Sequence, residues 1–438
     1  MWSRRAFLRT TGAALAARAN GLEHVVAATR AIADLSPEDA ARNELYWREI
    51  QSAFTLDRTL INFNNGHHSP QPRVVLDAVK RYMDLENQAP VYYGGMINGN
   101  SETVRRRLAA EFGCDTEEMA ITRNASESLQ IAQNGIDLAP GDEVITTEQD
   151  YGRMLTTWDQ RARRDKIKVT RLQFPVPTTQ QDLYERFERA ITPRTKVFHF
   201  CHITNLTGQL FPVQRLSRLA RQRGIWTIVD GAHAVAHFPY KLRELECDAY
   251  GVSLHKWLLA PLGTGFLYVP RQNIAKIWPL QAATDRRSND IRKFEEIGTA
   301  PAAVRAGIAE ALAFHQAIGV ERKAARLRYL TMRWAGALRQ NPRIKIHSSL
   351  EPGQTWGLAL VGIEGVDAPS ISAFLWQKYR IIANGVVHGD MPGPQFEYQG
   401  IRVTPNIYTT LEEVDTFTAA MEDILKNGIP PAAATRRG

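Results

Sequence analysis

A short apolar run at positions 224–229, Gly-Ile-Trp-Thr-Ile-Val, ends on Asp230, and this ending most constrains the fold. The run is rich in β-branched residues and is bounded by turn-forming residues, which predicts a strand buried on both faces. Such strands belong to parallel, helix-covered sheets, and ligands bind along the edge where their carboxyl ends meet. The sequence therefore predicts an α/β fold with the carboxylate of Asp230 facing a ligand. A helix cap is the alternative role for this carboxylate.

A lysine further along the chain supplies a second reactive group. Lys256 lies in the run Ser-Leu-His-Lys-Trp-Leu-Leu and precedes Pro261, Gly263 and Gly265, so its surroundings are apolar and rich in turns. Burial lowers the pKa of an amine toward the free base that attacks an aldehyde. A Schiff-base lysine, together with a carboxylate that keeps a pyridine nitrogen protonated, is what pyridoxal 5'-phosphate requires of a protein. A solvated surface lysine is the alternative.

With these residues the chain resembles the class V aminotransferase family, and within it the isopenicillin N epimerase-like branch. The similarity extends from Asn62 to about Tyr408. It implies a fold-type I transferase, in which helices cover a mostly parallel sheet in a large domain and a smaller α+β domain follows. Alternating strand and helix patterns from Leu60 to about Val269 favour the same sheet. The expected parts are a targeting segment (1–20), an N-terminal arm (21–64), a large domain that binds pyridoxal phosphate (65–300), a small domain with a long linking helix (301–428) and a disordered tail (429–438).

A helix start predicts where a phosphate group would bind. The run Thr-Arg-Asn-Ala-Ser-Glu at 122–127 leads into a helical pattern, and the free N–H groups of a helix N-terminus favour an anion. The resemblance implies that Ala125 and Ser126 hold the cofactor phosphate, with Ser253 and His255 beside the lysine as further contacts. It also implies that Thr299 reaches the phosphate of the partner subunit, which predicts a homodimer with a composite site. An ordinary asparagine or serine cap is the alternative for the helix start.

The resemblance also assigns contacts to the cofactor ring. Asp150 and Tyr151 occupy positions where relatives carry an acidic residue and then an aromatic ring or an imidazole, so Tyr151 is expected to stack on one face of the ring. Asn205 and His233 correspond to residues beside the phenolic oxygen. The alternatives are a tyrosine that packs on a helix start, a loop cap and a core histidine.

Substrate contacts are expected from two further segments. Arg402, in the run Gly-Ile-Arg-Val-Thr, resembles the family arginine that binds the substrate α-carboxylate. A planar guanidinium suits this task, because it can donate two parallel hydrogen bonds to the two oxygens of a carboxylate. His67 and His68 are adjacent histidines in a polar turn and are expected as substrate contacts, with solvent exposure as the alternative. An epimerase with two bases needs a second proton donor, and these histidines, Tyr92 and Tyr93 are the candidates.

The resemblance implies an enzyme that acts at the Cα of a small amino acid substrate. Removal and return of the Cα proton, as in isopenicillin N epimerase, is the favoured reaction, and transamination and cysteine-free carbon–sulfur lysis are the alternatives. A catalytically inactive binding scaffold is a remote alternative, because Lys256, Asp230 and Arg402 are all present.

The cysteines bear on one subgroup of the family. They are Cys114, Cys201 and Cys247, whereas the cysteine desulfurases of this family use a mobile cysteine in the C-terminal third. This distribution argues against persulfide-forming chemistry. Three thiols at irregular spacing also predict neither a metal site nor a disulfide framework.

The N-terminus predicts export. The run Ser-Arg-Arg-Ala-Phe-Leu-Arg at 3–9 matches the twin-arginine pattern, although Arg18 interrupts the apolar stretch that follows. A periplasmic location is therefore expected, with a basic N-terminal arm on a cytoplasmic protein as the alternative.

Charge and hydropathy exclude two classes of partner. Of the formal net charge of +8, six positive charges are arginines in the first twenty and last three residues, which leaves about +2 and predicts no nucleic-acid partner. A basic run from Arg161 to Lys168 is expected to be the solvated side of a helix and the loop after it. No segment has the length of a membrane span, which predicts no stable membrane insertion.

Overall fold

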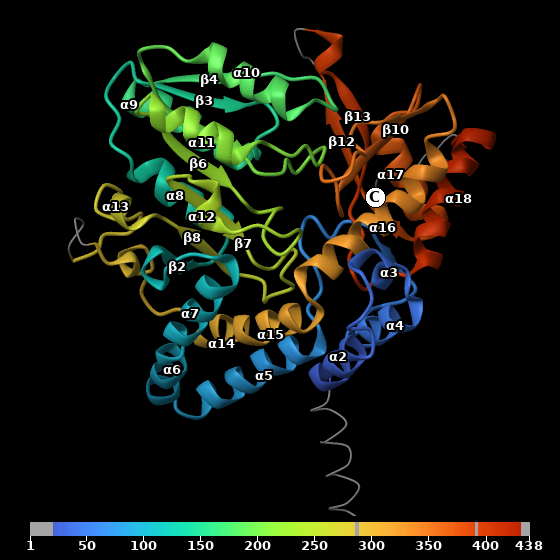
Figure 1. The fold of residues 1–438 in the computed structure, drawn as a ribbon, viewed down its shortest axis with the longest axis horizontal. Coiled ribbons are helices and arrows are strands. Elements are labelled where there is room, and N and C mark those ends of the chain that lie inside the picture. Colours follow the sequence, from blue (N-terminus) through green and yellow to red (C-terminus); the bar gives the residue numbers. More distant parts are fainter. Residues whose placement is uncertain (1–20, 285–288, 390–392, 431–438) are drawn as a thin grey trace, which may run out of the picture.

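The structure is a computed structural model, and it describes residues 21–284, 289–389 and 393–430 (Figure 1). The predicted targeting segment and most of the predicted tail lie outside these residues. Within the described ranges, no helix combines the length and the apolar character needed to cross a membrane.

A seven-stranded sheet forms the centre of the larger part of the molecule (Figure 1). Its strands are β2 Met119–Thr122, β3 Glu143–Thr147, β4 Lys168–Leu172, β5 Thr195–Cys201, β6 Trp226–Asp230, β7 Ala249–Ser253 and β8 Gly265–Tyr268. They lie in the order β2-β8-β7-β6-β5-β3-β4. Strand β8 runs antiparallel to both of its neighbours, and the other pairs are parallel. The predicted mostly parallel sheet is confirmed.

Apolar residues on both faces explain why the strand sequences read as continuous apolar runs. Neighbouring residues of a strand point to opposite faces. Val144, Val197 and Ile228 belong to one buried cluster, together with residues of α8 (Ala125–Gly135) and α9 (Gly152–Asp165). Their neighbours Phe198 and Val229 belong to a second cluster, together with residues of α7 (Ser101–Phe112), α10 (Gln180–Ala190) and α11 (Val213–Gln222). Helices therefore cover the sheet on both sides, as expected for buried parallel strands.

Within the described residues, helices precede the large sheet in sequence, alternate with its strands and continue after it. They are α2 Gly21–Arg30, α3 Pro37–Arg42, α4 Glu44–Ser52, α5 Arg73–Gln88, α6 Pro90–Gly99, α7 Ser101–Phe112, α8 Ala125–Gly135, α9 Gly152–Asp165, α10 Gln180–Ala190, α11 Val213–Gln222, α12 Leu242–Leu245, α13 Arg271–Ile274, α14 Ala302–Ala306, α15 Ile308–Ile318, α16 Val320–Leu338, α17 Ala368–Tyr379 and α18 Leu411–Asn427, with short 3-10 helices η1 Thr116–Glu118, η2 Ile291–Phe294 and η3 Pro394–Phe396.

A second, antiparallel sheet lies on the other side of the molecule (Figure 1). It contains β9 Ile344–Ile346, β10 Ala359–Ile363, β12 Asn384–His388 and β13 Tyr398–Val403 in the order β12-β13-β10-β9. Residues of α16, α17 and α18 pack on it in a separate apolar core that includes Trp334 and Phe417. Strand β1 Ile61–Asn62 pairs in parallel with β11 Ile381–Ile382 in a separate two-stranded sheet, which joins the N-terminal segment to the C-terminal part of the chain. The domain boundaries given above stay a prediction.

Two expectations from the sequence are wrong in detail. The linking segment is not one helix, because it is interrupted at Gly307 and Gly319, and Gly319 has a φ of +88°. At Gly307, a Cβ atom would lie 2.6 Å from the side chain of Val79 on α5, so close packing excludes a larger residue. Arg161 is not solvated, because its guanidinium is buried and donates to the carbonyl oxygens of Gln133 and Ile136.

Three neighbouring strands end at the same edge of the large sheet. Cys201 at the end of β5 pairs in register with Asp230 at the end of β6, and Asp230 pairs with Gly251 of β7. Asp230 therefore lies at a carboxyl edge, as predicted, and the turn after β7 brings Lys256 toward the same edge.

Candidate active site

One cavity of about 450 Å³ gathers most of the predicted site residues. Of the thirteen, eleven line it, namely His67, Ala125, Ser126, Tyr151, Asn205, Asp230, His233, Ser253, His255, Lys256 and Arg402. We refer to it as the Lys256 cavity. His68 lines a neighbouring cavity, and Thr299 lines a third one, beside α6. The sequence thus predicted residues that come from distant segments and meet in one place.

The amine of Lys256 faces an imidazole. Its Nζ lies 2.9 Å from Nε2 of His233, which follows the end of β6. Burial lowers the pKa of Lys256 to about 8, and the nearby charge of Asp230 opposes this shift. Burial also holds the pKa of His233 well below its usual value, so this ring is neutral. A partly desolvated amine beside a neutral imidazole is suited to nucleophilic attack and to proton transfer.

A buried network holds the segment that carries Lys256. The amine of Lys323, on α16, donates to the carbonyl oxygen of Trp257. The indole of Trp257 stacks on His237 with ring centroids 3.8 Å apart. Nε2 of His237 accepts the N–H of Gly357, so Nδ1 carries the proton and donates to the carbonyl oxygen of His233 at 2.7 Å. Contacts from α16, from the segment after β6 and from the segment before β10 therefore hold the position of the lysine.

Asp230 is buried at the sheet edge. Its Oδ1 accepts the N–H of Ala232 at 2.9 Å, and burial raises its pKa to about 6. Gly231 is required directly after it, because a Cβ atom there would lie 1.9 Å from the ring of Tyr250. The backbone after Asp230 therefore packs closely against a side chain of the neighbouring strand β7, and the carboxylate lines the Lys256 cavity.

The start of α8 forms the opposite side of the cavity. The hydroxyl of Ser253 accepts the N–H of Ala125 at 2.9 Å, and the side chain of Asn124 caps the helix by accepting the N–H of Glu127. The N–H of Ser126 has no acceptor among the described residues. A helix N-terminus with a free N–H and neighbouring hydroxyls is an anion-binding arrangement. The predicted asparagine cap and the predicted anion site are thus compatible.

Arg402 brings a cation to the same cavity. It lies on β13, is buried, and donates from Nη1 to the carbonyl oxygen of Asn205 at 2.9 Å and from Nη2 to Oδ1 of Asn64 at 2.7 Å. Among the described residues, no carboxylate lies within ion-pair distance of it. Burial lowers its pKa to about 10, which still leaves the guanidinium charged at neutral pH. A buried, unneutralised guanidinium favours an anionic ligand.

Several buried polar atoms in the cavity lack partners within the described part of the chain. They are Oδ1 of Asn205, Nδ1 of His233, Nδ1 of His255 and Nε of Arg402. Unpaired buried polar atoms are rare and costly in folded proteins, so they indicate where a polar ligand binds. With the carboxylate of Asp230, the amine of Lys256 and the start of α8, they fit an aromatic cofactor that carries a ring nitrogen, an aldehyde and a phosphate group.

Sequence reasoning missed three residues that shape the site. Asn64 orients Arg402, and Arg153 and Cys201 line the Lys256 cavity. Asp150 does not face the cavity as a ligand group, because its carboxylate accepts from the backbone of Thr147 and of Cys201 and so joins β3 to β5. Such roles depend on contacts between distant segments, and local sequence patterns give no signal for them.

Comparison with known proteins agrees with this geometry. The aminotransferase class-V family model matches residues 61–417. Isopenicillin N epimerase from Streptomyces clavuligerus is 28% identical over 395 residues, which cover 86% of this chain and 98% of that protein.

Two solved structures share the fold. The cysteine desulfurase of Thermococcus onnurineus NA1 superposes with a TM-score of 0.75 at 22% identity, over 86% of this chain and 98% of that chain. A mutant of the C-DES protein, with glycine covalently linked to its PLP cofactor, superposes with a TM-score of 0.72 at 23% identity, over 84% of this chain and all of that chain. These likenesses confirm the predicted fold type. The chain belongs to the class V aminotransferase family, and its cofactor is pyridoxal 5'-phosphate.

Proposed function

We propose that this chain is a pyridoxal phosphate-dependent epimerase that removes the Cα proton of an amino acid and returns it. The observation that carries the proposal is the meeting of Lys256, Asp230 and Arg402 in one cavity of about 450 Å³. The first two groups suit the two ends of a pyridoxal ring, and the third suits the carboxylate of an amino acid. Bound pyridoxal phosphate supplies an electron sink for the electron pair left at Cα when a bond to that carbon breaks.

Each part of the cavity has a separate task in this proposal. Lys256 would hold the aldehyde of the cofactor, and its free amine would accept the Cα proton of the substrate. Asp230 keeps the ring nitrogen protonated, because a buried carboxylate strongly favours a cationic partner. The start of α8, with Ser126 and Ser253, holds the phosphate. Tyr151, which is 39% exposed, lies at the mouth of the cavity, where its ring can stack on the cofactor.

Arg402 binds the substrate carboxylate and so places Cα beside the amine of Lys256. Its contacts with Asn64 and Asn205 hold the guanidinium in place before substrate binds, which reduces the entropy lost on binding. His67 also lines the cavity and is the candidate for proton return. Desolvation and the adjacent His68 lower its pKa, so an imidazolium formed there gives up its proton more readily than usual.

The cysteines support epimerisation over persulfide formation. Cys201 lines the cavity, but burial raises the pKa of its thiol well above the usual value, so the nucleophilic thiolate is suppressed. Cys114 and Cys247 do not line the cavity, and burial raises the pKa of Cys114 to about 12. The similarity to isopenicillin N epimerase, which extends over nearly the whole length of that protein, also supports epimerisation.

We also propose that two copies of the chain form a composite site. Thr299 lines the cavity beside α6, apart from the Lys256 cavity of its own chain. Helix α6 exposes apolar side chains there, with Val91 94% and Tyr92 72% accessible, which is unusual for a surface that stays in water. A partner copy covering α6 would bury these side chains and bring Thr299 to the partner's phosphate.

The test is incubation of the cofactor-loaded enzyme with L- and D-amino acids in deuterium oxide, followed by NMR and mass spectrometry. Deuterium at Cα with inversion is the expected result. Release of a keto acid to an acceptor would replace the epimerase with a transaminase, and pyruvate with ammonia would replace it with a lyase. Protein that takes up no pyridoxal phosphate, or a cofactor that borohydride fixes at a lysine other than Lys256, would contradict the proposal entirely.

A further inference from the structure

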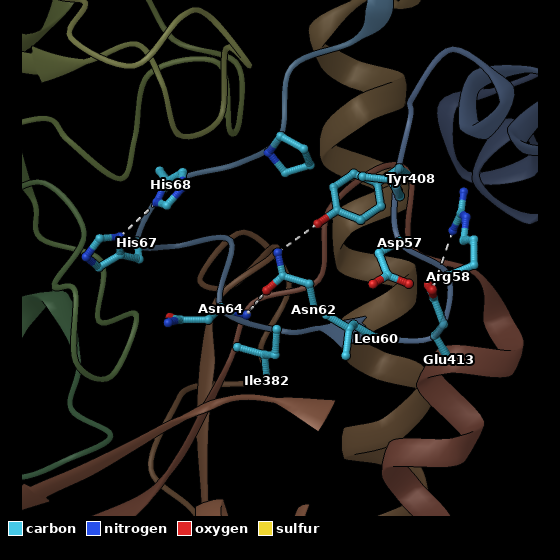
Figure 2. Close-up of a pocket in the computed structure, with 12 residues that line it drawn as sticks. Asp57, Arg58, Leu60, Asn62, Asn64, His67, His68, Ile382, Tyr408 and Glu413 are labelled. Atoms are coloured by element: carbon cyan, nitrogen blue, oxygen red, sulfur yellow. Dashed lines mark hydrogen bonds and ion pairs between the residues drawn. The ribbon is translucent and has the colours of Figure 1, made fainter. Parts of the chain in front are cut away.

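A second cavity, of about 370 Å³, adjoins the Lys256 cavity and has no role in the chemistry described above. Three parts of the chain form its walls, namely the segment from Leu56 to Pro70, Ile382 of β11, and the stretch from Tyr408 to Glu413 at the start of α18. Figure 2 shows His67 and His68 at one end of this group and Asp57, Arg58 and Glu413 at the other. We refer to it as the Asp57 cavity.

The two cavities meet at His67. This side chain lines both of them, and its Nδ1 lies 2.9 Å from Nδ1 of His68, which lines the Asp57 cavity. Asn64 gives a second connection, because it lines the Asp57 cavity and accepts a hydrogen bond from Arg402 in the Lys256 cavity. A ligand held by Arg402 therefore lies next to the opening of the Asp57 cavity.

The polar groups in the middle of the Asp57 cavity are bound to one another. The hydroxyl of Tyr408 lies 3.1 Å from Nδ2 of Asn62 and also donates to Asn65, while Oδ1 of Asn62 accepts the N–H of Asn64 at 2.9 Å. These contacts leave mainly apolar surface for a ligand, from Leu60, Ile382 and the ring of Tyr408, and Ile382 is 36% exposed. This part of the cavity suits a chain of methylene groups.

The far end of the cavity carries a net negative charge. Arg58 forms an ion pair with Glu413 at 3.4 Å, which leaves Asp57 as an additional carboxylate. Oδ1 of Asp57 accepts from the backbone and the hydroxyl of Thr59, and these hydrogen bonds lower its pKa and keep it ionised. One guanidinium against two carboxylates favours a cationic group over an anionic one.

We propose that the Asp57 cavity is the side-chain subsite of the active site, and that it selects amino acids with an apolar stem and a terminal ammonium or guanidinium group. The proposal rests on the proposed function. With the α-carboxylate on Arg402 and Cα beside Lys256, the side chain passes His67, its methylene groups contact Leu60 and Ile382, and its charged end reaches Asp57.

The experiment compares three ligands that share the same α-carbon groups. L-alanine, L-norleucine and L-lysine are titrated into the cofactor-loaded enzyme, and Kd is measured by visible absorbance and by calorimetry. L-norleucine is expected to bind more tightly than L-alanine, because it fills the apolar part of the subsite. L-lysine is expected to bind about threefold more tightly than L-norleucine, as one solvent-exposed ion pair provides.

Two variants separate the apolar and the charged contributions. Asp57→Asn is expected to remove the advantage of L-lysine over L-norleucine, whereas Glu49→Gln, which removes an exposed carboxylate on α4, is expected to leave it unchanged. Ile382→Trp fills the cavity and is expected to weaken both long ligands relative to L-alanine. Circular dichroism and cofactor content establish that each variant folds, and Asp57→Asn tests the subsite independently if Ile382→Trp does not fold.

Two results would overturn the subsite. One is equal affinity of the coloured, cofactor-loaded enzyme for L-lysine and L-norleucine, and the other is tighter binding of L-2-aminoadipate, which carries an anionic end. Either result leaves the proposed function standing. Failure of the protein to take up pyridoxal phosphate would overturn both, so the two failures are distinguishable.

Discussion

The Lys256 cavity and an arginine cluster between α7 and η2 both contain buried charged side chains, but they neutralise them differently. In the cluster, which consists of Glu102, Arg105, Arg292 and Glu295, each guanidinium contacts carboxylates of the same chain. In the cavity, Lys256 faces a neutral imidazole, and Arg402 contacts an amide and a carbonyl oxygen.

The difference separates a structural arrangement from a functional one. Burial lowers the pKa of Arg105, but the hydrogen bonds that it donates to Glu295 and Glu102 outweigh this and raise its pKa above the usual value. Arg402 and Lys256 have pKa values lowered by burial, because no carboxylate of the chain forms an ion pair with them among the described residues. Folding therefore leaves the cavity short of negative charge, which a phosphate group and a substrate carboxylate can supply.

The largest effect is expected from Lys256→Ala. Loss of the amine removes both the covalent link to the cofactor and the base at Cα, so turnover should fall by about a thousandfold or more. Steady-state rates and borohydride labelling measure the two losses. Lys196→Ala, at an exposed lysine of β5, is the matched control and should keep both. A Lys256→Ala protein with more than a tenth of the wild-type rate would show that another residue supplies the amine.

The next largest effect is expected in stability, from Arg105→Met. Removal of the guanidinium leaves the largely buried carboxylate of Glu295 with only the more distant Arg305 and the N–H of Ile121, and breaking a buried ion pair costs about 3 kcal/mol. Denaturant unfolding of the cofactor-loaded protein at one fixed concentration measures the loss. Arg106→Met removes an exposed neighbour on the same helix and should change stability by less than about 0.5 kcal/mol.

A change in kcat without a change in the free energy of unfolding of Arg105→Met would contradict the distinction between the two regions. The arginine cluster would then belong to the catalytic machinery and not to the structural part of the fold. Measuring both quantities on the same preparation decides between these roles.

A smaller effect is expected from Arg402→Lys, which keeps the charge and removes the planar pair of donors. The KM for amino acids should rise about tenfold, because a lysine cannot donate two parallel hydrogen bonds to the two oxygens of a carboxylate. The kcat should change less, since Lys256 and Asp230 are untouched. Binding of an amine that lacks the carboxylate should be unaffected, and an equal loss for that amine would contradict the assignment.

The large sheet could be predicted from local sequence patterns, because a strand that is buried on both faces must be apolar at nearly every position. The run ending at Asp230 is apolar at every position because alternate residues, such as Ile228 and Val229, enter cores on opposite faces. The linking segment was less predictable, because Gly307 and Gly319 interrupt a pattern that is otherwise helical throughout. Whether a glycine breaks a helix depends on what packs against it, as the side chain of Val79 does at Gly307.

The site was predictable only where a residue has a chemical role of its own. Lys256, Asp230 and Arg402 carry functional groups that stand out in their segments, and all three line one cavity. Asn64 and Lys323 act by holding other residues, and they meet their partners across hundreds or dozens of positions in the chain. The same limit applies to Arg161. Its basic run is typical of a solvated surface, but its guanidinium donates to two carbonyl oxygens, one on α8 and one just after that helix.

The last expected effect is a pH dependence of cofactor loading, which requires no substitution. Burial lowers the pKa of Lys256 to about 8, so its free amine is a minor form at pH 6 and the major form at pH 9. Because the free amine attacks the aldehyde, uptake of pyridoxal phosphate by the apoprotein should accelerate by about tenfold per pH unit below pH 8 and then level off. Stopped-flow absorbance measures the rate. If Lys256 instead formed an ion pair, as the charged groups of the arginine cluster do, the uptake rate would keep rising to about pH 10. That profile would show that Lys256 is neutralised within the fold, like the arginines of the cluster.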